Sequence, residues 1–276
     1  MEGRLARLVS SHIGSSAALR GANLVKPMKD IVLNVLAIDT GGTHVKILAA
    51  GNKIYRDFSS GPTLTAKRMV SAVKKLAGDW KYDMVTIGYP GLVVHGRPAL
   101  EPHNLGPGWV GFDFAAAFKR PVKIINDAAM QALGNYKRGR MLFLGLGTGL
   151  GSAMIVDGII VPMELGHLPY KKATYEDYVG IRGLKKHGQK RWRRHVVDVV
   201  ERLIAALEPG DVVLGGGNVT KLKKLPPGCR ASDNAKAFIG GFRLWAKADE
   251  GRRPLKKRVA SFVSEKRRTP VNQTTN

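Results

Sequence analysis

Two glycine-rich turns in this 276-residue sequence have the composition of phosphate-binding loops. The first reads Asp-Thr-Gly-Gly-Thr-His-Val-Lys over residues 39–46, and the second reads Leu-Gly-Leu-Gly-Thr-Gly-Leu-Gly over residues 144–151. Glycine lets backbone N–H groups come close to a phosphate, and threonine adds a hydroxyl donor. Either turn alone would read as an ordinary hairpin, but two such turns can hold one phosphate chain from both sides. Neither matches a Walker A loop or a dinucleotide-binding motif.

The first turn also carries two charged groups. Asp39 ends a predicted strand, and its carboxylate can hold Mg²⁺ directly or through water. Lys46 can meet a charged phosphate oxygen. The predicted phosphate-binding residues of the two turns are Asp39, Gly41, Gly42, Thr43, Lys46, Gly147, Thr148, Gly149 and Gly151.

A carboxylate stands between a predicted strand and a predicted helix, in the pair Asn126-Asp127. Phosphoryl transfer to a hydroxyl needs a base that orients the nucleophile and takes its proton, and Asp127 is placed for that task. The alternative is that Asp127 only caps the helix. Taken alone, the position favours the capping role.

Two further motifs suit ligand binding. In Glu164-Leu-Gly-His167 the two polar side chains can reach one pair of sugar hydroxyls, although a solvated loop is the alternative. Two such residues are too few for a metal site. Three consecutive glycines, Gly215, Gly216 and Gly217, follow a predicted buried strand and suit a nucleotide base or ribose lying against backbone. A helix-entry turn is an equal alternative.

The apolar pattern predicts the elements that must position these motifs. The predicted strands cover residues 32–39, 45–50, 53–58, 84–88, 122–125, 141–146, 152–156 and 211–214, and the first three form an antiparallel meander. The predicted helices cover residues 64–76, 112–118, 127–136 and 235–245, and Trp192 to Leu207 mark one face of a long helix. A shift of 107 residues superposes the two glycine turns and the strands that follow them. This duplication predicts two related α/β lobes, residues 31–125 and 126–246, with a ligand cleft between them.

The charge is the unusual feature of the composition. Forty-five Lys and Arg against 21 Asp and Glu give a formal net charge of +24. Residues 1–30 contribute +3 and residues 247–276 contribute +6, which leaves +15 on residues 31–246. This balance favours a polyanionic partner such as nucleic acid, an anionic membrane surface or polyphosphate. Residues 182–194 hold seven basic and no acidic residues, which indicates either a solvated helix face or a border of the cleft.

Other classes of protein are not favoured. The one cysteine, Cys229, excludes an internal disulfide and a multi-cysteine zinc site, so no zinc is expected. No apolar run approaches the roughly 18 residues of a membrane span, and no secretory signal is evident, so a cytoplasmic location is expected. Residues 1–30 read as a disordered basic extension and residues 247–276 as a mobile basic tail.

In their order along the chain these motifs resemble the ROK family of sugar kinases, within the actin-like and hexokinase-like ATPase superfamily. The resemblance rests on residues 39–46, Pro-Gly at 90–91, an Asn-Leu…Trp stretch at 104–109, and the motifs at 126–127, 146–151, 164–167 and 215–217. Within the family the sequence is most similar to the polyphosphate glucokinases, which share the Glu-Leu-Gly-His form and lack zinc-binding cysteines.

The resemblance implies two ribonuclease H-like lobes and a set of roles. Asp127 would activate a sugar hydroxyl, and Gly215 to Gly217 would border adenosine. The glycine turns and Asp39 would bind phosphates and Mg²⁺. The sugar would be held by Asn104, Asn126, Asp127, Glu164 and His167.

The implied activity is transfer of a phosphoryl group from polyphosphate, ATP or both to a hexose, with glucose as the leading acceptor and a homodimer common among relatives. Two alternatives stay open. One is an ATP-only kinase for another hexose. The other is a catalytically silent actin-like protein that binds nucleic acid non-specifically through its basic surface.

Overall fold

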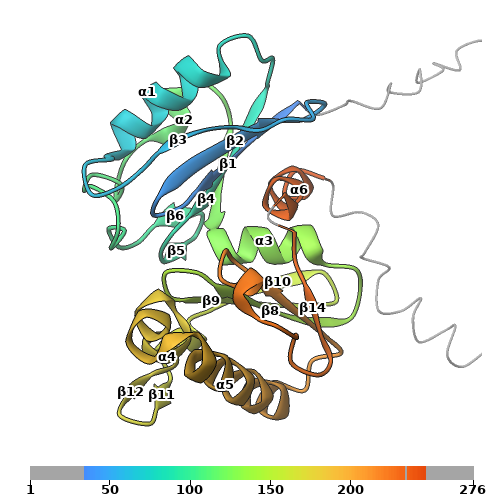
Figure 1. Ribbon diagram of the computed structural model, residues 1–276. Coiled ribbons are helices and arrows are strands. Elements are labelled where there is room, and N and C mark those ends of the chain that lie inside the picture. Colours follow the sequence, from blue (N-terminus) through green and yellow to red (C-terminus); the bar gives the residue numbers. More distant parts are fainter. Residues whose placement is uncertain (1–33, 234, 247–276) are drawn as a thin grey trace, which may run out of the picture. The chain divides into compact units, whose positions relative to one another are not determined.

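The computed structural model describes residues 34–233 and 235–246 (Figure 1). The predicted basic extension and basic tail lie outside these residues. Within the described ranges, no helix has both the length and the apolar character needed to cross a membrane.

The first sheet has the strand order β3-β2-β1-β4-β7 (Figure 1). β1, β2 and β3 form the predicted antiparallel meander, and β4 and β7 run parallel to β1. The strands are β1 (Val35–Thr40), β2 (His44–Ala49), β3 (Arg56–Ser59), β4 (Met84–Tyr89) and β7 (Val122–Asn126), and a small hairpin pairs β5 (Val93–Val94) with β6 (Arg97–Pro98).

Alternate residues of β1 face opposite layers, as the two-residue period of a strand requires. Leu36 and Ile38 join the core under α1 (Ala66–Ala77) and α2 (Phe114–Phe118). Ala37 faces the other way and meets α6 (Lys236–Arg243). The middle of the sheet is therefore covered on both faces, which explains why β1 and β4 are nearly continuous apolar runs.

The second sheet repeats this order as β10-β9-β8-β13-β14. Its core also has two faces, because Leu142 and Leu144 pack beneath the long helix whereas Met141 and Phe143 pack against α3 (Asp127–Asn135). The strands are β8 (Arg140–Leu146), β9 (Leu150–Val156), β10 (Ile159–Met163), β13 (Asp211–Gly215) and β14 (Cys229–Ala231). The helices are α4 (Tyr175–Val179) and α5 (Ile181–Leu207), with short η1 (Leu165–His167) and η2 (Val219–Lys221) and the hairpin of β11 (Pro169–Tyr170) and β12 (Ala173–Thr174).

The helices α3 and α6 lie side by side with their backbones in contact (Figure 1). A Cβ added to Gly134 would stand 1.7 Å from the Lys236 carbonyl oxygen, and one on Gly240 would stand 1.8 Å from that of Met130. The Arg243 guanidinium donates to the Leu133 carbonyl at 2.8 Å. Glycine is required at this crossing because any side chain would push the two helices apart.

The two-sheet α/β fold predicted from the sequence is confirmed, but some details differ. The third strand begins at Arg56 rather than at residue 53, and β10, β14 and α4 were not predicted. In addition, a single shift of 107 residues cannot superpose both strands of the first hairpin on both strands of the second, because the two turns differ in length. Thr40 pairs with Val45 around four turn residues, whereas Leu146 pairs with Leu150 around three. The division into lobes at residues 125 and 126 remains a prediction.

Candidate active site

Asp127 is the first residue of α3, but the helix is capped by its neighbour. Asn126 Oδ1 accepts the Ala129 N–H at 3.1 Å, and Asn126 Nδ2 donates to the Gly91 carbonyl at 3.2 Å. Asp127 Oδ1 accepts only the N–H of Ala128, at 2.8 Å. The capping role considered for Asp127 therefore belongs to Asn126, and Asp127 Oδ2 has no hydrogen bond within the described residues.

The surroundings of Asp127 are arranged to disfavour its charge. Burial, the charge of Asp39 and the charge of Glu164 raise the pKa of Asp127 to about 7, against the lowering effect of the Ala128 hydrogen bond. Burial likewise raises the pKa of Asp39 to about 6, although Lys46 lowers it. Carboxyl groups with such values can exchange protons near neutral pH, as general bases do.

We expect kcat/KM for the sugar to fall as the pH drops below about 7, because only the ionised Asp127 can accept a proton. The fall should approach about tenfold per pH unit, with Asp39 sharing the titration because the two carboxyls are coupled. The measurement is a pH profile of kcat/KM, with circular dichroism at each pH to show that the protein is folded. A profile that stays level down to about pH 5 would contradict the assignment.

The first glycine turn is held between β1, β2 and a neighbouring loop. Asp39 lies opposite Lys46 in the β1–β2 register. The Gly41 carbonyl accepts the Ser60 hydroxyl at 2.7 Å. Gly42 packs beside Asn104, because a Cβ on Gly42 would lie 3.3 Å from the Asn104 Cβ. The structure thus brings this predicted sugar residue to the predicted phosphate turn.

The second glycine turn is fixed from several sides. The Gly147 carbonyl accepts the Asn218 amide at 2.9 Å and the Ile181 N–H at 3.1 Å. A Cβ on Gly151 would lie 3.0 Å from the Ala128 Cβ, so β9 touches α3 one residue after Asp127. The turn is therefore anchored to the helix that carries the candidate base.

Of the three glycines at the end of β13, Gly216 packs on this turn. Gly216 has φ of +83°, which suits glycine alone, and a Cβ there would meet the Leu146 carbonyl oxygen at 2.5 Å. Nothing lies within 4 Å of a Cβ built on Gly217. Gly216 thus has a structural reason to be glycine, whereas Gly217 is exposed and its carbonyl accepts the Thr220 hydroxyl at 3.1 Å.

The Glu164-Leu-Gly-His167 motif is anchored by a buried hydroxyl. Ser152 Oγ donates to the Met163 carbonyl at 2.8 Å and accepts the Leu165 N–H at 3.1 Å, which fixes the backbone on both sides of Glu164. The charge of Glu164 acts on Asp127, so these two predicted residues share an electrostatic environment. His167 and Thr43 are exposed, and within the described residues neither side chain has a hydrogen bond that ties it to the rest of the site.

Glu176 is a site residue that the sequence analysis missed. A Cβ built on Gly149 would fall 2.3 Å from Glu176 Oε2, and one on Gly166 would lie 3.5 Å from the Glu176 Cβ. Its carboxylate therefore lies against the second turn, and its Cβ lies against the Glu164 motif. A local signal exists, because Thr174 and Asp177 form a capping box that predicts the start of α4 and places Glu176 in its first turn.

The carboxylates of this site fit a magnesium ion. Burial raises the pKa of Asp127 most, the charges of Asp39 and Glu164 raise it further, and a divalent cation would offset the repulsion from these two charges. Among the described residues no cluster of three or more His, Cys, Asp or Glu side chains could enclose a metal. Mg²⁺ does not need one, since it keeps several waters and binds one or two carboxylates plus donor phosphates. Asp39 would hold it, and the bound ion would neutralise charge on the transferred phosphoryl group.

Comparisons with known proteins agree with this architecture. The model of the ROK family matches residues 35–183. The polyphosphate glucokinase of Mycobacterium tuberculosis (strain ATCC 25618 / H37Rv) is 27% identical over 215 residues, which cover 69% of this chain and 80% of that protein.

Two solved structures share the fold. The inorganic polyphosphate/ATP-glucomannokinase from Arthrobacter sp. strain KM has a TM-score of 0.68 and 22% identity, covering 77% of this chain and 98% of its own. The ROK family glucokinase from Streptomyces griseus, solved with glucose and AMPPNP, has a TM-score of 0.63 and 16% identity, covering 76% and 98%.

Proposed function

The chain belongs to the ROK family, and we propose that it is a hexose kinase that phosphorylates glucose at its 6-hydroxyl. The observation that carries the proposal is Asp127, a carboxyl with one free oxygen and a pKa near neutrality, anchored beside a glycine-rich phosphate turn. A half-buried carboxyl with a raised pKa and no catalytic task would be an unexplained cost to stability.

Asp127 acts as the general base in this reaction. The sugar hydroxyl oxygen forms the new O–P bond while its proton passes to Asp127 Oδ2. The bond from the transferred phosphorus to the bridging oxygen of the donor breaks, and the shortened donor leaves with that electron pair. Lys46 and the N–H groups of the two glycine turns stabilise the charge that spreads over the phosphoryl oxygens.

The sugar is held by residues on three separate segments. Asn104, Glu164 and His167 can hydrogen-bond hydroxyls, because within the described residues their side chains form no hydrogen bond, while the Glu164 carbonyl accepts the His167 N–H at 3.2 Å. Asn126 keeps one unused amide hydrogen after its bonds to Ala129 and Gly91. Glucose is favoured because curated polyphosphate glucokinases match 69% of this chain.

The donor is inorganic polyphosphate, alone or beside ATP. Support comes from the +15 charge of residues 31–246 and from the polyphosphate-using relatives. The basic run at residues 182–194 contributes less than its composition suggests. Arg182 pairs with Asp177 at 2.9 Å, and Arg193 donates to the Lys221 carbonyl at 2.7 Å, so both serve the fold.

A matrix of sugars against donors tests the function. Glucose, mannose, fructose and N-acetylhexosamines are each offered with ATP or polyphosphate, and sugar phosphate is measured. We expect glucose to give the highest kcat/KM with at least one donor. Activity with another hexose and with ATP alone would support the alternative of an ATP-only kinase for another hexose. If the folded protein phosphorylates no sugar with either donor in the presence of Mg²⁺, the alternative that remains is a catalytically silent protein that binds nucleic acid. The homodimer and the cytoplasmic location remain predictions.

The salt dependence of KM separates the two donors. Each phosphate neutralised by Lys or Arg releases condensed counterions, so a long polyanion loses affinity steeply as salt rises. Between about 50 and 300 mM salt, KM for long-chain polyphosphate should rise several-fold more than KM for ATP. Tripolyphosphate has a charge similar to that of ATP and is too short to extend over the basic surface, so its KM should depend on salt as the KM for ATP does. Equal slopes for all three would show that the basic surface does not contact the chain.

A further inference from the structure

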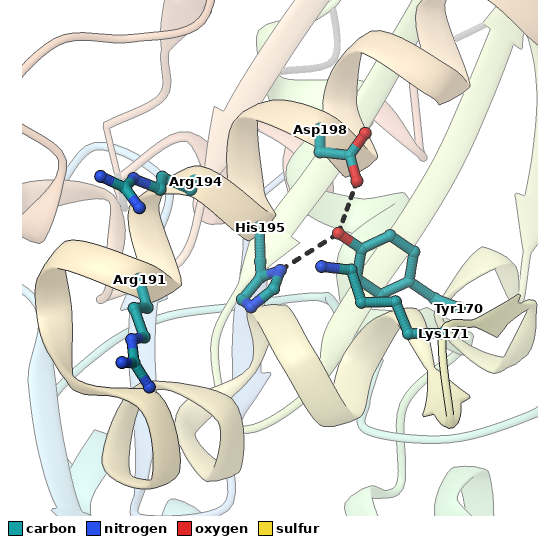
Figure 2. A pocket seen from close by; sticks show the side chains of 6 residues that line it. All are labelled: Tyr170, Lys171, Arg191, Arg194, His195 and Asp198. Carbon is teal, nitrogen blue, oxygen red and sulfur yellow. Dashed lines mark hydrogen bonds between the residues drawn. The ribbon is translucent and has the colours of Figure 1, made fainter.

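A surface cavity of about 380 Å³ lies between β11 and α5 (Figure 2), and none of the residues that line it belongs to the candidate active site. Its size falls in the range of small-molecule sites. It is lined by Tyr170, Lys171, Arg191, Arg194, His195 and Asp198.

The positive charge of this cavity is not compensated. Lys171, Arg191 and Arg194 are exposed, and none of them forms an ion pair with an acidic side chain in the described ranges. Asp198, the one carboxylate in the lining, accepts the Tyr170 hydroxyl at 2.5 Å and Arg202 Nε at 2.9 Å. Three cations therefore face a cavity whose acidic group is already engaged.

The Tyr170 hydroxyl also determines which ring nitrogen of His195 carries the proton. Tyr170 has one hydroxyl proton and gives it to Asp198, so the contact of 3.1 Å with His195 Nδ1 requires Nδ1 to donate. Nε2 then has no proton in the neutral ring. Figure 2 shows this second nitrogen on the side of the ring away from Tyr170. A bound anion would favour the protonated ring, in which Nε2 becomes a donor.

The groups that face His195 favour its neutral form in the absence of a ligand. Burial lowers the pKa of His195 most, followed by the charges of Lys171 and His187, while Asp198 raises it. Tyr178 of α4 and Tyr170 of β11 complete the surroundings through edge contacts with the ring. An anion in the cavity would supply the negative charge that these surroundings lack.

The site is built on a rigid support. Arg191, Arg194, His195 and Asp198 follow the three- and four-residue spacing of one helix face. Trp192 points the other way, is fully buried, and donates to the Val179 carbonyl at 2.7 Å. This anchor fixes the helix segment between the two arginines.

We propose that this cavity is a binding site for a phosphoryl anion, separate from the site where phosphoryl transfer occurs. Guanidinium groups bind phosphate oxygens in paired hydrogen bonds, and Lys171 and His195 complete the set of donors. The phosphoryl group can belong to a polyphosphate chain or to a small phosphate such as a sugar phosphate. The proposal is independent of the kinase activity, because binding is measured without turnover.

Calorimetry on the full chain tests the site with orthophosphate, glucose 6-phosphate, tripolyphosphate and long-chain polyphosphate as separate probes. The variant Arg191→Gln/Arg194→Gln should weaken binding of at least one probe about tenfold or more, since each lost hydrogen bond is charge-assisted. Lys74→Gln/Lys75→Gln removes the same charge from exposed positions on α1 and should change binding less than twofold. If both variants lose the same amount of binding affinity, the loss is explained by net charge alone and the proposal is overturned.

The His195 ring gives a readout that activity cannot supply. A titration by NMR, with assignment from His195→Gln, should show the pKa of His195 rising when the bound probe is present. Sulfate, whose charge is constant between about pH 5.5 and 8, serves as a probe that does not titrate. A polyphosphate-only response identifies the chain as ligand, and a response to glucose 6-phosphate or orthophosphate identifies a small phosphate. No shift with any probe would overturn the proposal.

Discussion

Asp127→Asn should lower the turnover number by about 10²–10⁴-fold, the range of general-base contributions. The amide keeps the shape of the side chain and can still accept the Ala128 N–H through Oδ1, so the start of α3 should not move. It cannot take the proton of the sugar hydroxyl. The measurement is kcat with saturating sugar and donor, beside calorimetric binding of the sugar, which should be nearly unchanged.

The same substitution should make the protein more stable at alkaline pH. A carboxyl whose pKa is raised from 3.8 to about 7 favours the fold while it is protonated, and that contribution is lost as pH rises from about 4 through 7. At pH 8 the buried charge therefore costs stability, up to about 4 kcal/mol for three pH units. Asparagine has no charge to bury, so Tm of the variant should exceed that of the wild type at pH 8, and the difference should vanish near pH 4.

These two results together separate chemistry from folding. Asp83→Asn, on an exposed carboxylate, is the matched control and should change neither kcat nor the pH dependence of Tm. An Asp127→Asn variant that retains more than about a third of the wild-type rate would remove Asp127 from the role of base. An inactive variant with a lower Tm at pH 8 would show that the substitution disrupts the fold instead.

Gly134→Ala should be strongly destabilising. Its Cβ would stand 1.7 Å from the Lys236 carbonyl oxygen and 2.6 Å from the carbonyl carbon, and backbone atoms cannot rotate aside as a side chain can. α3 and α6 would have to separate, which breaks the Arg243 bonds to the end of α3. We expect a loss of about 3 kcal/mol or more in the free energy of unfolding, which is ~6–12 °C in Tm for a domain of this size.

Gly210→Ala is the matched control for this substitution. A Cβ there would lie 3.6 Å from the Arg140 carbonyl oxygen, an ordinary contact, and Tm should change by no more than about 2 °C. If Gly134→Ala has the Tm of the control, the two helices are not in backbone contact in solution. Since α3 begins at Asp127, partial loss of kcat in the Gly134 variant is expected as well.

Much of the fold was predictable because its signals are local. Buried strands covered on both faces read as apolar runs, and the glycine turns mark where those strands end. The elements that were missed are short or exposed. β10 has a mostly exposed pattern and contains a proline, β14 has three residues, and α4 has five, so each gives only a weak signal in the sequence.

Some features of the candidate site could likewise be identified from the sequence, and others could not. The sequence alone identified the two glycine-rich turns, the carboxylate between a strand and a helix, and the Glu-Leu-Gly-His motif, because each depends on residues adjacent in the chain. It could not determine whether Asn126 or Asp127 caps α3, because both are common caps and adjacent to the helix. The backbone of that turn decided the matter in favour of Asn126.

Contacts between segments distant in sequence became visible in the three-dimensional structure alone. Gly149 meets Glu176, Gly134 meets Lys236, and Tyr170 meets Asp198, and no repeat or spacing in the sequence predicts these pairs. The pKa of Asp127 also depends on the tertiary structure. Its causes are burial and the charges of Asp39 and Glu164, and these three residues lie on separate segments of the chain. The physical reason is that periodicity reports which face of one element is buried, whereas electrostatics and close approach depend on which other element covers it.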